Sequence, residues 1–183
     1  TRLLMPAAQR DPRGRAVGAV MVALLLCGCG GESSPGQEKL QEEFRRLAEG
    51  FDRETGARRI SVAELKSRLR QERATVLVDT RERPEFDVGH LDGAVLLPPS
   101  QLADGSLEFP EDTLVVTYCT AGYRSGLAAV ELERRLGRDV YSLTGGIIGW
   151  FNSGGPIVGK QGRAADQVHA YSDEWKKYVI ERR

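Results

Sequence analysis

The sequence predicts an α/β protein whose central parallel sheet is flanked by helices. Four short apolar runs lack polar alternation, as is typical of strands buried on both faces of a sheet; they span residues 75–79, 94–98, 113–119 and 139–143. Helical stretches alternate with these runs, as expected when helices connect parallel strands. The chain has 183 residues, 40% of them apolar, which suits one compact domain with extensions at both ends.

Residues 1–28 are expected to form a signal peptide. Four arginines and a single acid precede an uncharged apolar run at residues 16–26. A run of this length is too short to span a bilayer as a helix, which needs about 20 residues. A basic stretch, a short apolar run and small residues are together typical of a secretory signal peptide. The alternative is a buried helix, which Pro6 and Pro12 disfavour.

The end of this segment resembles the lipobox of bacterial lipoproteins, in which a small residue precedes a cysteine that is lipidated and becomes the new N-terminus. Cys29 follows Gly28, whereas Cys27 follows Leu26, which is too large for that position. The resemblance implies that Cys29 is lipidated and anchors the protein to a bacterial membrane, in the periplasm or at the cell surface. The alternative is cleavage and secretion without a lipid.

Residues 29–57 are expected to hold a flexible tether and an N-terminal helix. The tether is rich in Gly and Ser. The helix is predicted over residues 37–49 and is expected to end at Gly50. Apolar residues at helical spacing line one of its faces: Leu40, Phe44, Leu47 and Phe51.

Two further helices are predicted within the domain. Ser61 and Glu64 have the spacing of a capping box, in which each side chain satisfies a backbone N–H of the other residue. This pair marks the start of a helix whose apolar residues repeat along one face. A second helix is predicted from Ser125 to Leu136, and Gly137 is expected to end it.

The C-terminal extension, residues 157–183, is expected to carry one helix over residues 172–181. Two acids suit its first turn, because a helix N-terminus favours negative charge. Three apolar residues of this helix are expected to dock onto the domain: Trp175, Tyr178 and Val179.

The composition excludes several classes of protein. Lys+Arg and Asp+Glu both number 26, which argues against an overall basic protein that binds nucleic acid through its net charge. Two histidines and three cysteines make a multi-ligand metal centre unexpected, and three cysteines do not make a disulfide framework. No cofactor is expected, and a monomer is favoured.

The segment with the clearest chemistry is VTYCTAGYRSG, residues 116–126. Cys119 follows a predicted strand at its carboxyl end, the edge at which open parallel sheets bind ligands. The loop after it is small enough to curl, so that its N–H groups can surround an anion. The helix N-terminus and Arg124 add positive potential, and together these features favour the thiolate, the nucleophilic form of cysteine. A structural cysteine is the alternative reading.

Two further stretches, residues 78–98 and 143–150, together with the cysteine loop, resemble the rhodanese family of sulfurtransferases. The first matches a D-x-R…E-F-x-x-G-H-[IL]-x-G-A pattern through Asp79, Arg81, Glu85, Phe86, Gly89, His90, Leu91, Gly93 and Ala94. The second matches a G-G-x-x-x-W pattern through Gly145, Gly146 and Trp150. The resemblance covers about residues 58–156 and implies a single rhodanese domain.

The resemblance implies covalent catalysis through a persulfide on Cys119, with a sulfur donor such as thiosulfate and a thiophilic acceptor such as cyanide or a thiol. The expected partners are therefore small sulfur-containing anions and thiols. The residues expected to bind the substrate and the persulfide are those of the loop: Thr120, Ala121, Gly122, Tyr123 and Arg124. One alternative function is a phosphatase or an arsenate reductase. Related enzymes of those classes use a longer C-x5-R loop, whereas this loop has the form C-x4-R. The other alternative is a non-catalytic module that binds a partner.

Three residues are expected to support the site. Asp79 and Arg81, at a strand end, either form an ion pair that orders the cysteine loop, the favoured reading, or shape the site directly. Ser125 is expected to cap the helix after the loop. His90 is expected to make a structural hydrogen bond and not to act as a base.

Overall fold

The computed structural model describes residues 34–72, 74–102 and 109–182. The predicted signal peptide, Cys27 and the predicted lipidation site at Cys29 lie outside these residues. Within the described part of the chain, no helix is both long enough and apolar enough to cross a membrane.

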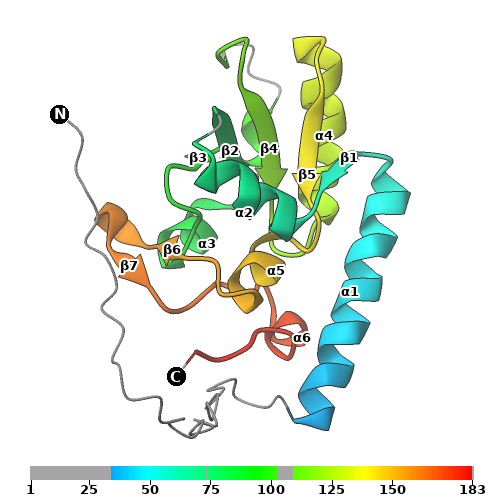
Figure 1. The fold of residues 1–183 in the computed structure, drawn as a ribbon, viewed down its shortest axis with the longest axis vertical. Helices are drawn as coiled ribbons and strands as arrows, with labels where there is room; N and C mark the ends of the chain where they lie inside the picture. Colours follow the sequence, from blue (N-terminus) through cyan, green and yellow to red (C-terminus); the bar gives the residue numbers. More distant parts are fainter. Residues whose placement is uncertain (1–33, 73, 103–108, 183) are drawn as a thin grey trace, which may run out of the picture. The chain divides into compact units, whose positions relative to one another are not determined.

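A five-stranded parallel sheet forms the centre of the domain, in the order β1-β5-β4-β2-β3 (Figure 1). Its strands are β1 (Arg58–Ile60), β2 (Thr75–Asp79), β3 (Val95–Leu96), β4 (Leu114–Tyr118) and β5 (Val140–Leu143). The predicted α/β fold class is confirmed. All four apolar runs became strands, although β3 is shorter than predicted. β1 was missed, because it is a short edge strand with two exposed arginines and no apolar run.

Helices cover both faces of the sheet. They are α2 (Val62–Arg70) and α5 (Gly146–Asn152) on one face and α4 (Tyr123–Leu136) on the other, and α3 (Arg83–Val88) follows β2 in the chain. Neighbouring residues of a strand point to opposite faces of the sheet, so one strand contributes side chains to the hydrophobic cores on both faces. Val116 packs with residues of α2 and α5 in one core, whereas Val115 packs with residues of α4 in the other. The predicted capping box at Ser61 and Glu64 is present at the start of α2.

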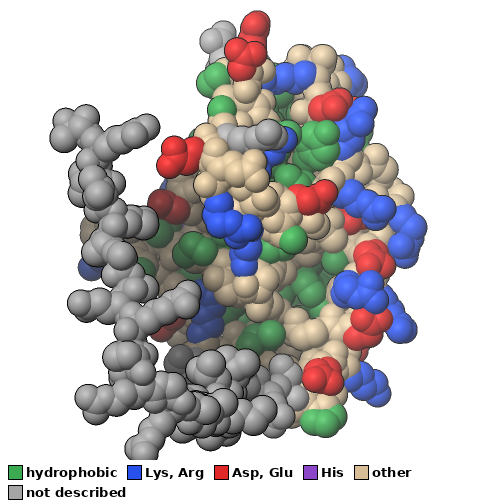
Figure 2. All heavy atoms as spheres, in the orientation of Figure 1, with side chains coloured by type: hydrophobic (Ala, Val, Ile, Leu, Met, Phe, Trp, Pro, Cys, Tyr) green, Lys and Arg blue, Asp and Glu red, His purple; other side chains and the backbone are tan. Residues whose placement is uncertain are grey.

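The N-terminal helix α1 (Pro35–Thr55) is longer than predicted. Gly50 lies inside it, and the helix ends at Gly56, which takes the left-handed conformation with φ of 68°. A glycine inside a helix costs about 1 kcal/mol relative to alanine, and packing against the domain outweighs a cost of that size. The buried face of α1 carries Phe44 and Ala48. Its outer face carries acidic and basic side chains, with ion pairs such as Arg45–Glu42 (Figure 2).

The C-terminal segment contains only short elements: β6 (Ile157–Val158), the 3-10 turn η2 (Lys160–Gly162), β7 (Ala164–Ala165) and α6 (Asp173–Lys176). The other 3-10 turn of the described chain, η1 (Pro99–Gln101), follows β3. The helix predicted over residues 172–181 is therefore mostly wrong. Side chains of the domain take the backbone hydrogen bonds that a longer helix would use: Asn152 bonds the carbonyl of Tyr178 and the N–H of Ile180.

The expected docking of this segment is confirmed at its aromatic side chains. Tyr178 is buried, and its ring centroid lies 5.4 Å from that of Phe44 on α1. Trp175 meets the same ring edge-on at 6.5 Å. Phe44 and Tyr178 also share a buried cluster with Ala121 and Ile148 of the domain, so the two terminal segments pack against each other and against the domain.

Candidate active site

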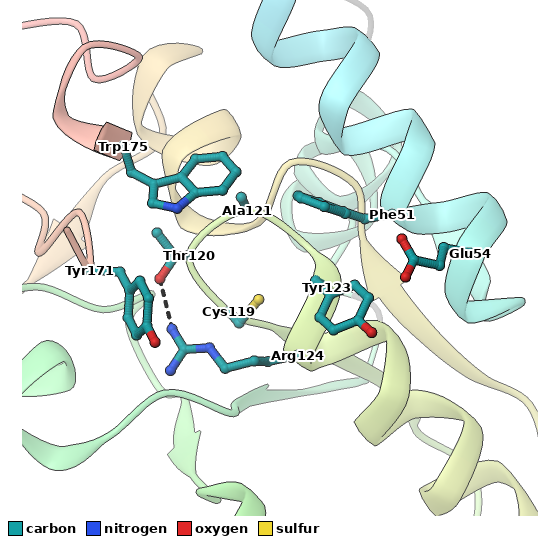
Figure 3. A pocket seen from close by; sticks show the side chains of 9 residues that line it. All are labelled: Phe51, Glu54, Cys119, Thr120, Ala121, Tyr123, Arg124, Tyr171 and Trp175. Carbon is teal, nitrogen blue, oxygen red and sulfur yellow. Dashed lines mark hydrogen bonds between the residues drawn. The ribbon is translucent and has the colours of Figure 1, made fainter. Parts of the chain in front are cut away.

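Cys119 lies directly after β4, at the carboxyl edge of the sheet, and is only 2% exposed. It faces a cavity of ≈ 390 Å³ between the loop and the two terminal segments (Figure 3). The backbone N–H of Gly122 donates to its Sγ at 3.2 Å, and the Ser125 hydroxyl lies 3.6 Å from the same sulfur. The Gly122 N–H is therefore a donor that stabilises an anionic sulfur at this position.

The loop turns tightly enough for this contact because Gly122 has a φ of 122°, a conformation that side chains disfavour. As a result, α4 begins at Tyr123, two residues earlier than predicted. The expectation that Ser125 caps this helix is wrong, since Gly122 is the N-cap and Ser125 lies in the first turn. The Ser125 hydroxyl instead donates to the carbonyl of Gly122 at 3.0 Å and contacts Ser142.

The start of α5 is hydrogen-bonded to the backbone of the cysteine loop. Ile147 N–H donates to the carbonyl of Cys119 at 2.8 Å, and Ile148 N–H donates to that of Thr120 at 3.2 Å. Gly146 precedes them with a φ of 53°, and a Cβ built there would lie 2.4 Å from the carbonyl oxygen of Cys119. The G-G-x-x-x-W stretch therefore positions the backbone of the cysteine loop, and only glycine fits at this contact.

Arg124 is bound by Glu85, an acid that is not among the predicted site residues. Its guanidinium donates to both carboxylate oxygens of Glu85, at 2.9 Å and 2.8 Å, and to the hydroxyl of Thr120 at 2.9 Å. Burial lowers the pKa of Arg124. The hydrogen bond with Glu85 and the nearby charges of Cys119 and Glu85 raise it by a larger amount, so the net shift is upward. Arg124 therefore stays charged, with that charge largely compensated by Glu85.

Glu85 lies on α3 and is 4% exposed. Burial raises its pKa, but hydrogen bonds from Arg124 and from the N–H of Glu82, with the charges of Arg124 and Arg81, lower it more. The carboxylate is thus ionised and buried. The one signal for Glu85 in the sequence was its place in the E-F-x-x-G-H pattern; its partner is 39 residues away.

The predicted ion pair between Asp79 and Arg81 is present and fully buried, with Nη2 and Oδ2 2.6 Å apart. Arg81 Nη2 also donates to the carbonyl of Gly89 at 2.7 Å. Neither side chain lines the cavity around Cys119. The pair instead ties the end of β2 to the turn after α3, the helix that carries Glu85.

His90 makes the structural contacts expected of it. Its Nδ1 lies 2.9 Å from the carbonyl oxygen of Phe86, and its ring stacks on that of Phe86 at 3.6 Å. Among the described residues, no three His, Cys, Asp or Glu side chains gather closely enough to hold a metal ion.

The loop residues predicted to bind substrate come together in the cavity, with the exception of Gly122, which turns the backbone. Thr120, Ala121, Tyr123 and Arg124 line the cavity with Cys119. The other lining residues come from the terminal segments: Phe51 and Glu54 of α1, and Tyr171 and Trp175 near the C-terminus (Figure 3). The sequence patterns predict only that these segments pack on the domain.

The sequence matches the family described as "Rhodanese-like domain" over residues 61–153, which is half of the chain. The chain belongs to this family. The match includes the cysteine loop, Glu85 and the glycines before α5. It excludes Phe51, Glu54, Tyr171 and Trp175, so one side of the cavity is formed by residues outside the rhodanese-like domain.

Relatives include proteins named as sulfurtransferases. The chain is 36% identical over 93 residues to the probable adenylyltransferase/sulfurtransferase MoeZ of Mycobacterium tuberculosis, covering 50% of this chain and 24% of that protein. It is 37% identical over 98 residues to a sulfurtransferase of Allochromatium vinosum, covering 54% of this chain and 92% of that one.

A solved structure of similar fold is the thiosulfate sulfurtransferase of Pseudomonas aeruginosa. It superposes with a TM-score of 0.54 at 23% identity, covering 74% of this chain and 26% of that one. At this identity the likeness concerns the fold, a rhodanese-like α/β domain.

Proposed function

We propose that the protein is a sulfurtransferase that moves a sulfane sulfur from thiosulfate or a persulfide to a thiophilic acceptor, through a persulfide on Cys119. The observation that carries the proposal is the position of the Cys119 sulfur, which faces the cavity and accepts a hydrogen bond from the Gly122 N–H at 3.2 Å. The family membership and the relatives named as sulfurtransferases support it.

In the first half-reaction, the Cys119 thiolate attacks the outer sulfur of thiosulfate. The sulfur–sulfur bond of the donor breaks, and its electron pair leaves with sulfite. Cys119 then carries an anionic persulfide whose terminal sulfur extends into the cavity. α4 begins at Tyr123, directly after the loop, and the N-terminus of a helix favours an anion because its first N–H groups have no carbonyl partner within the helix.

In the second half-reaction, the acceptor attacks the terminal sulfur. The persulfide bond breaks, and its electron pair returns to Cys119 as thiolate. Cyanide leaves as thiocyanate, and a thiolate leaves as an organic persulfide. Arg124 lies close enough to Cys119 to act on it electrostatically, but its bonds to Glu85 and Thr120 suggest a second role in holding the loop in shape.

The proposal is tested by sulfur loading of a chain in which Cys27 and Cys29 are replaced by serine, so that Cys119 is the only cysteine. Incubation with thiosulfate should add the mass of one sulfur atom per chain, and cyanide should remove it as thiocyanate. The further variant Cys119→Ser should lose both steps while remaining folded.

A phosphatase would cleave an aryl phosphate and ignore thiosulfate. A partner-binding module would form no adduct. A folded protein that takes up no sulfur from thiosulfate or from a persulfide donor would overturn the sulfurtransferase proposal.

We also propose that Cys29 carries a lipid that anchors the protein to a bacterial membrane on its extracytoplasmic side. The small residue before Cys29 and the short apolar run upstream support this proposal. Cys29→Ala should release the protein from membranes or leave it unprocessed, whereas Cys27→Ala should change little. Equal membrane association of both variants with the wild type would refute the assignment.

A further inference from the structure

The residues outside the family match give the cavity an aromatic wall (Figure 3). The Phe51 ring lies 6.0 Å from that of Trp175 and 5.6 Å from that of Tyr123, measured between centroids. Tyr171 lies over the Arg124 guanidinium, with the guanidinium carbon 4.7 Å from the ring centroid. Aromatic walls of this kind bind the body of an organic molecule better than a small inorganic ion.

The charges that line the cavity are unbalanced toward negative. Among the described residues that line the cavity, Arg124 is the one cation, and Glu85 accepts hydrogen bonds from both of its terminal nitrogens. Glu54 is exposed and makes no ion pair with any residue that the structure describes. The lining therefore presents one uncompensated carboxylate beside the aromatic rings, a setting that favours a cation over a second anion.

The size of the cavity also favours an organic ligand. Its volume is ≈ 390 Å³, within the range of about 300–1,000 Å³ that small-molecule pockets occupy. Thiosulfate or cyanide would leave most of this space unfilled. Cys119 lies almost fully buried at its side, so a thiol that reaches the sulfur brings the rest of its body against Phe51 and Trp175.

We propose that this cavity selects a cationic organic thiol, an aminothiol, as the sulfur acceptor; the inference rests on the proposed sulfurtransferase function. The ammonium group interacts with the Glu54 carboxylate and with the faces of the neighbouring rings. The acceptor thiol loses its proton to solvent, and its thiolate attacks the terminal sulfur of the Cys119 persulfide. The bond between the two persulfide sulfurs breaks, Cys119 thiolate is regenerated, and the acceptor leaves as a persulfide.

The test compares three acceptors that differ only in the group at the end of a two-carbon chain: cysteamine is cationic, 2-mercaptoethanol is neutral and 3-mercaptopropionate is anionic. The full chain with Cys27→Ser and Cys29→Ser is loaded with sulfur from thiosulfate. The rate at which each acceptor removes that sulfur is followed by intact mass. Each variant is compared with the parent chain for the same acceptor, so that differences in intrinsic thiol reactivity cancel.

Glu54→Gln should slow discharge by cysteamine about 2- to 5-fold, the size of an exposed charge interaction, and should speed discharge by 3-mercaptopropionate. The neutral acceptor should change little. Trp175→Leu, which keeps an apolar side chain but removes the ring, should slow cysteamine by a similar factor. Glu38→Gln is the matched control, because Glu38 lies on the same helix but does not line the cavity.

The experiment separates a failure of the proposed function from a failure of the proposed acceptor selection. If the parent chain takes up no sulfur, the proposed function fails and the acceptor inference fails with it. If the chain takes up sulfur, but Glu54→Gln changes discharge by all three acceptors equally or not at all, the sulfurtransferase proposal stands and the selection of a cationic acceptor is wrong.

Discussion

Replacing Gly146 with alanine should distort the cysteine loop, although Gly146 touches no substrate. The backbone of Gly146 packs against the backbone of the loop, and an added Cβ would lie 2.4 Å from the carbonyl oxygen of Cys119 and 2.8 Å from the carbonyl carbon of Thr120. Both neighbours are main-chain atoms, so no side chain can turn aside to make room. Either α5 or the loop has to move.

The size of the effect has two parts. Gly146 has a φ of 53°, and a residue with a Cβ in the left-handed region costs about 1–2 kcal/mol. Overpacking of a well-packed interior costs about 1–3 kcal/mol. The expected loss of unfolding free energy is therefore about 2–5 kcal/mol. The hydrogen bond from Ile147 N–H to the carbonyl of Cys119 should weaken as the loop shifts.

Gly137→Ala separates these two parts. Gly137 also has a positive φ, of 63°, but a Cβ there would meet nothing within 4 Å. Its loss should be limited to the conformational part, about 1–2 kcal/mol. Urea unfolding of both variants measures the stability, and sulfur loading from thiosulfate measures the state of the loop. Gly146→Ala should load sulfur much more slowly than Gly137→Ala under conditions where both are folded.

Equal stability and equal loading of the two variants would refute this reasoning. Such a result would mean that the contact between Gly146 and the loop is loose enough to absorb a methyl group. The G-G-x-x-x-W stretch would then not be what positions Cys119.

Glu85→Gln should lower the unfolding free energy by about 1.5–3 kcal/mol at neutral pH, since it weakens a charged hydrogen-bonded pair. The fold lowers the pKa of Glu85, so the stability that its carboxylate contributes is fully present above the ordinary pKa of 4.5 and is lost as pH falls through the lower pKa of the folded state. The difference in unfolding free energy between wild type and variant, measured by urea unfolding, should therefore shrink in acid. A difference that grows in acid would contradict this. Arg81→Met should cost about 3–5 kcal/mol, because it leaves the buried Asp79 carboxylate without its partner. The double variant Asp79→Leu with Arg81→Met should recover much of that loss, and failure to recover any would mean that Arg81 acts through its other contacts.

Features that depend on neighbouring residues were predictable from the sequence. The strand before Cys119 is an apolar run, and the loop after it is defined by consecutive residues, so the position of the cysteine at the edge of the sheet followed directly. The capping box of α2 was likewise a local pattern, with Ser61 and Glu64 three residues apart. In these cases one segment of the chain contains all the residues that determine the structure.

Other features depended on exact backbone angles that residue types only suggest. Gly50 and Gly56 are both glycines near the end of α1, but only Gly56 takes the left-handed conformation that ends the helix. The residue type of Ser125 predicts a helix cap. Gly122, with its positive φ, is the N-cap instead, so the helix starts two residues earlier and the Ser125 hydroxyl donates to the carbonyl of Gly122.

The sequence by itself determined the class of fold and which cysteine lies at the edge of the sheet, because both depend on short runs of consecutive residues. Only the tertiary structure decided what surrounds that cysteine. Glu85 reaches Arg124 because α3 packs beside the loop. Phe51 and Trp175 meet at the cavity although more than half of the chain separates them, since burying their rings against each other and against the domain brings the two terminal segments together.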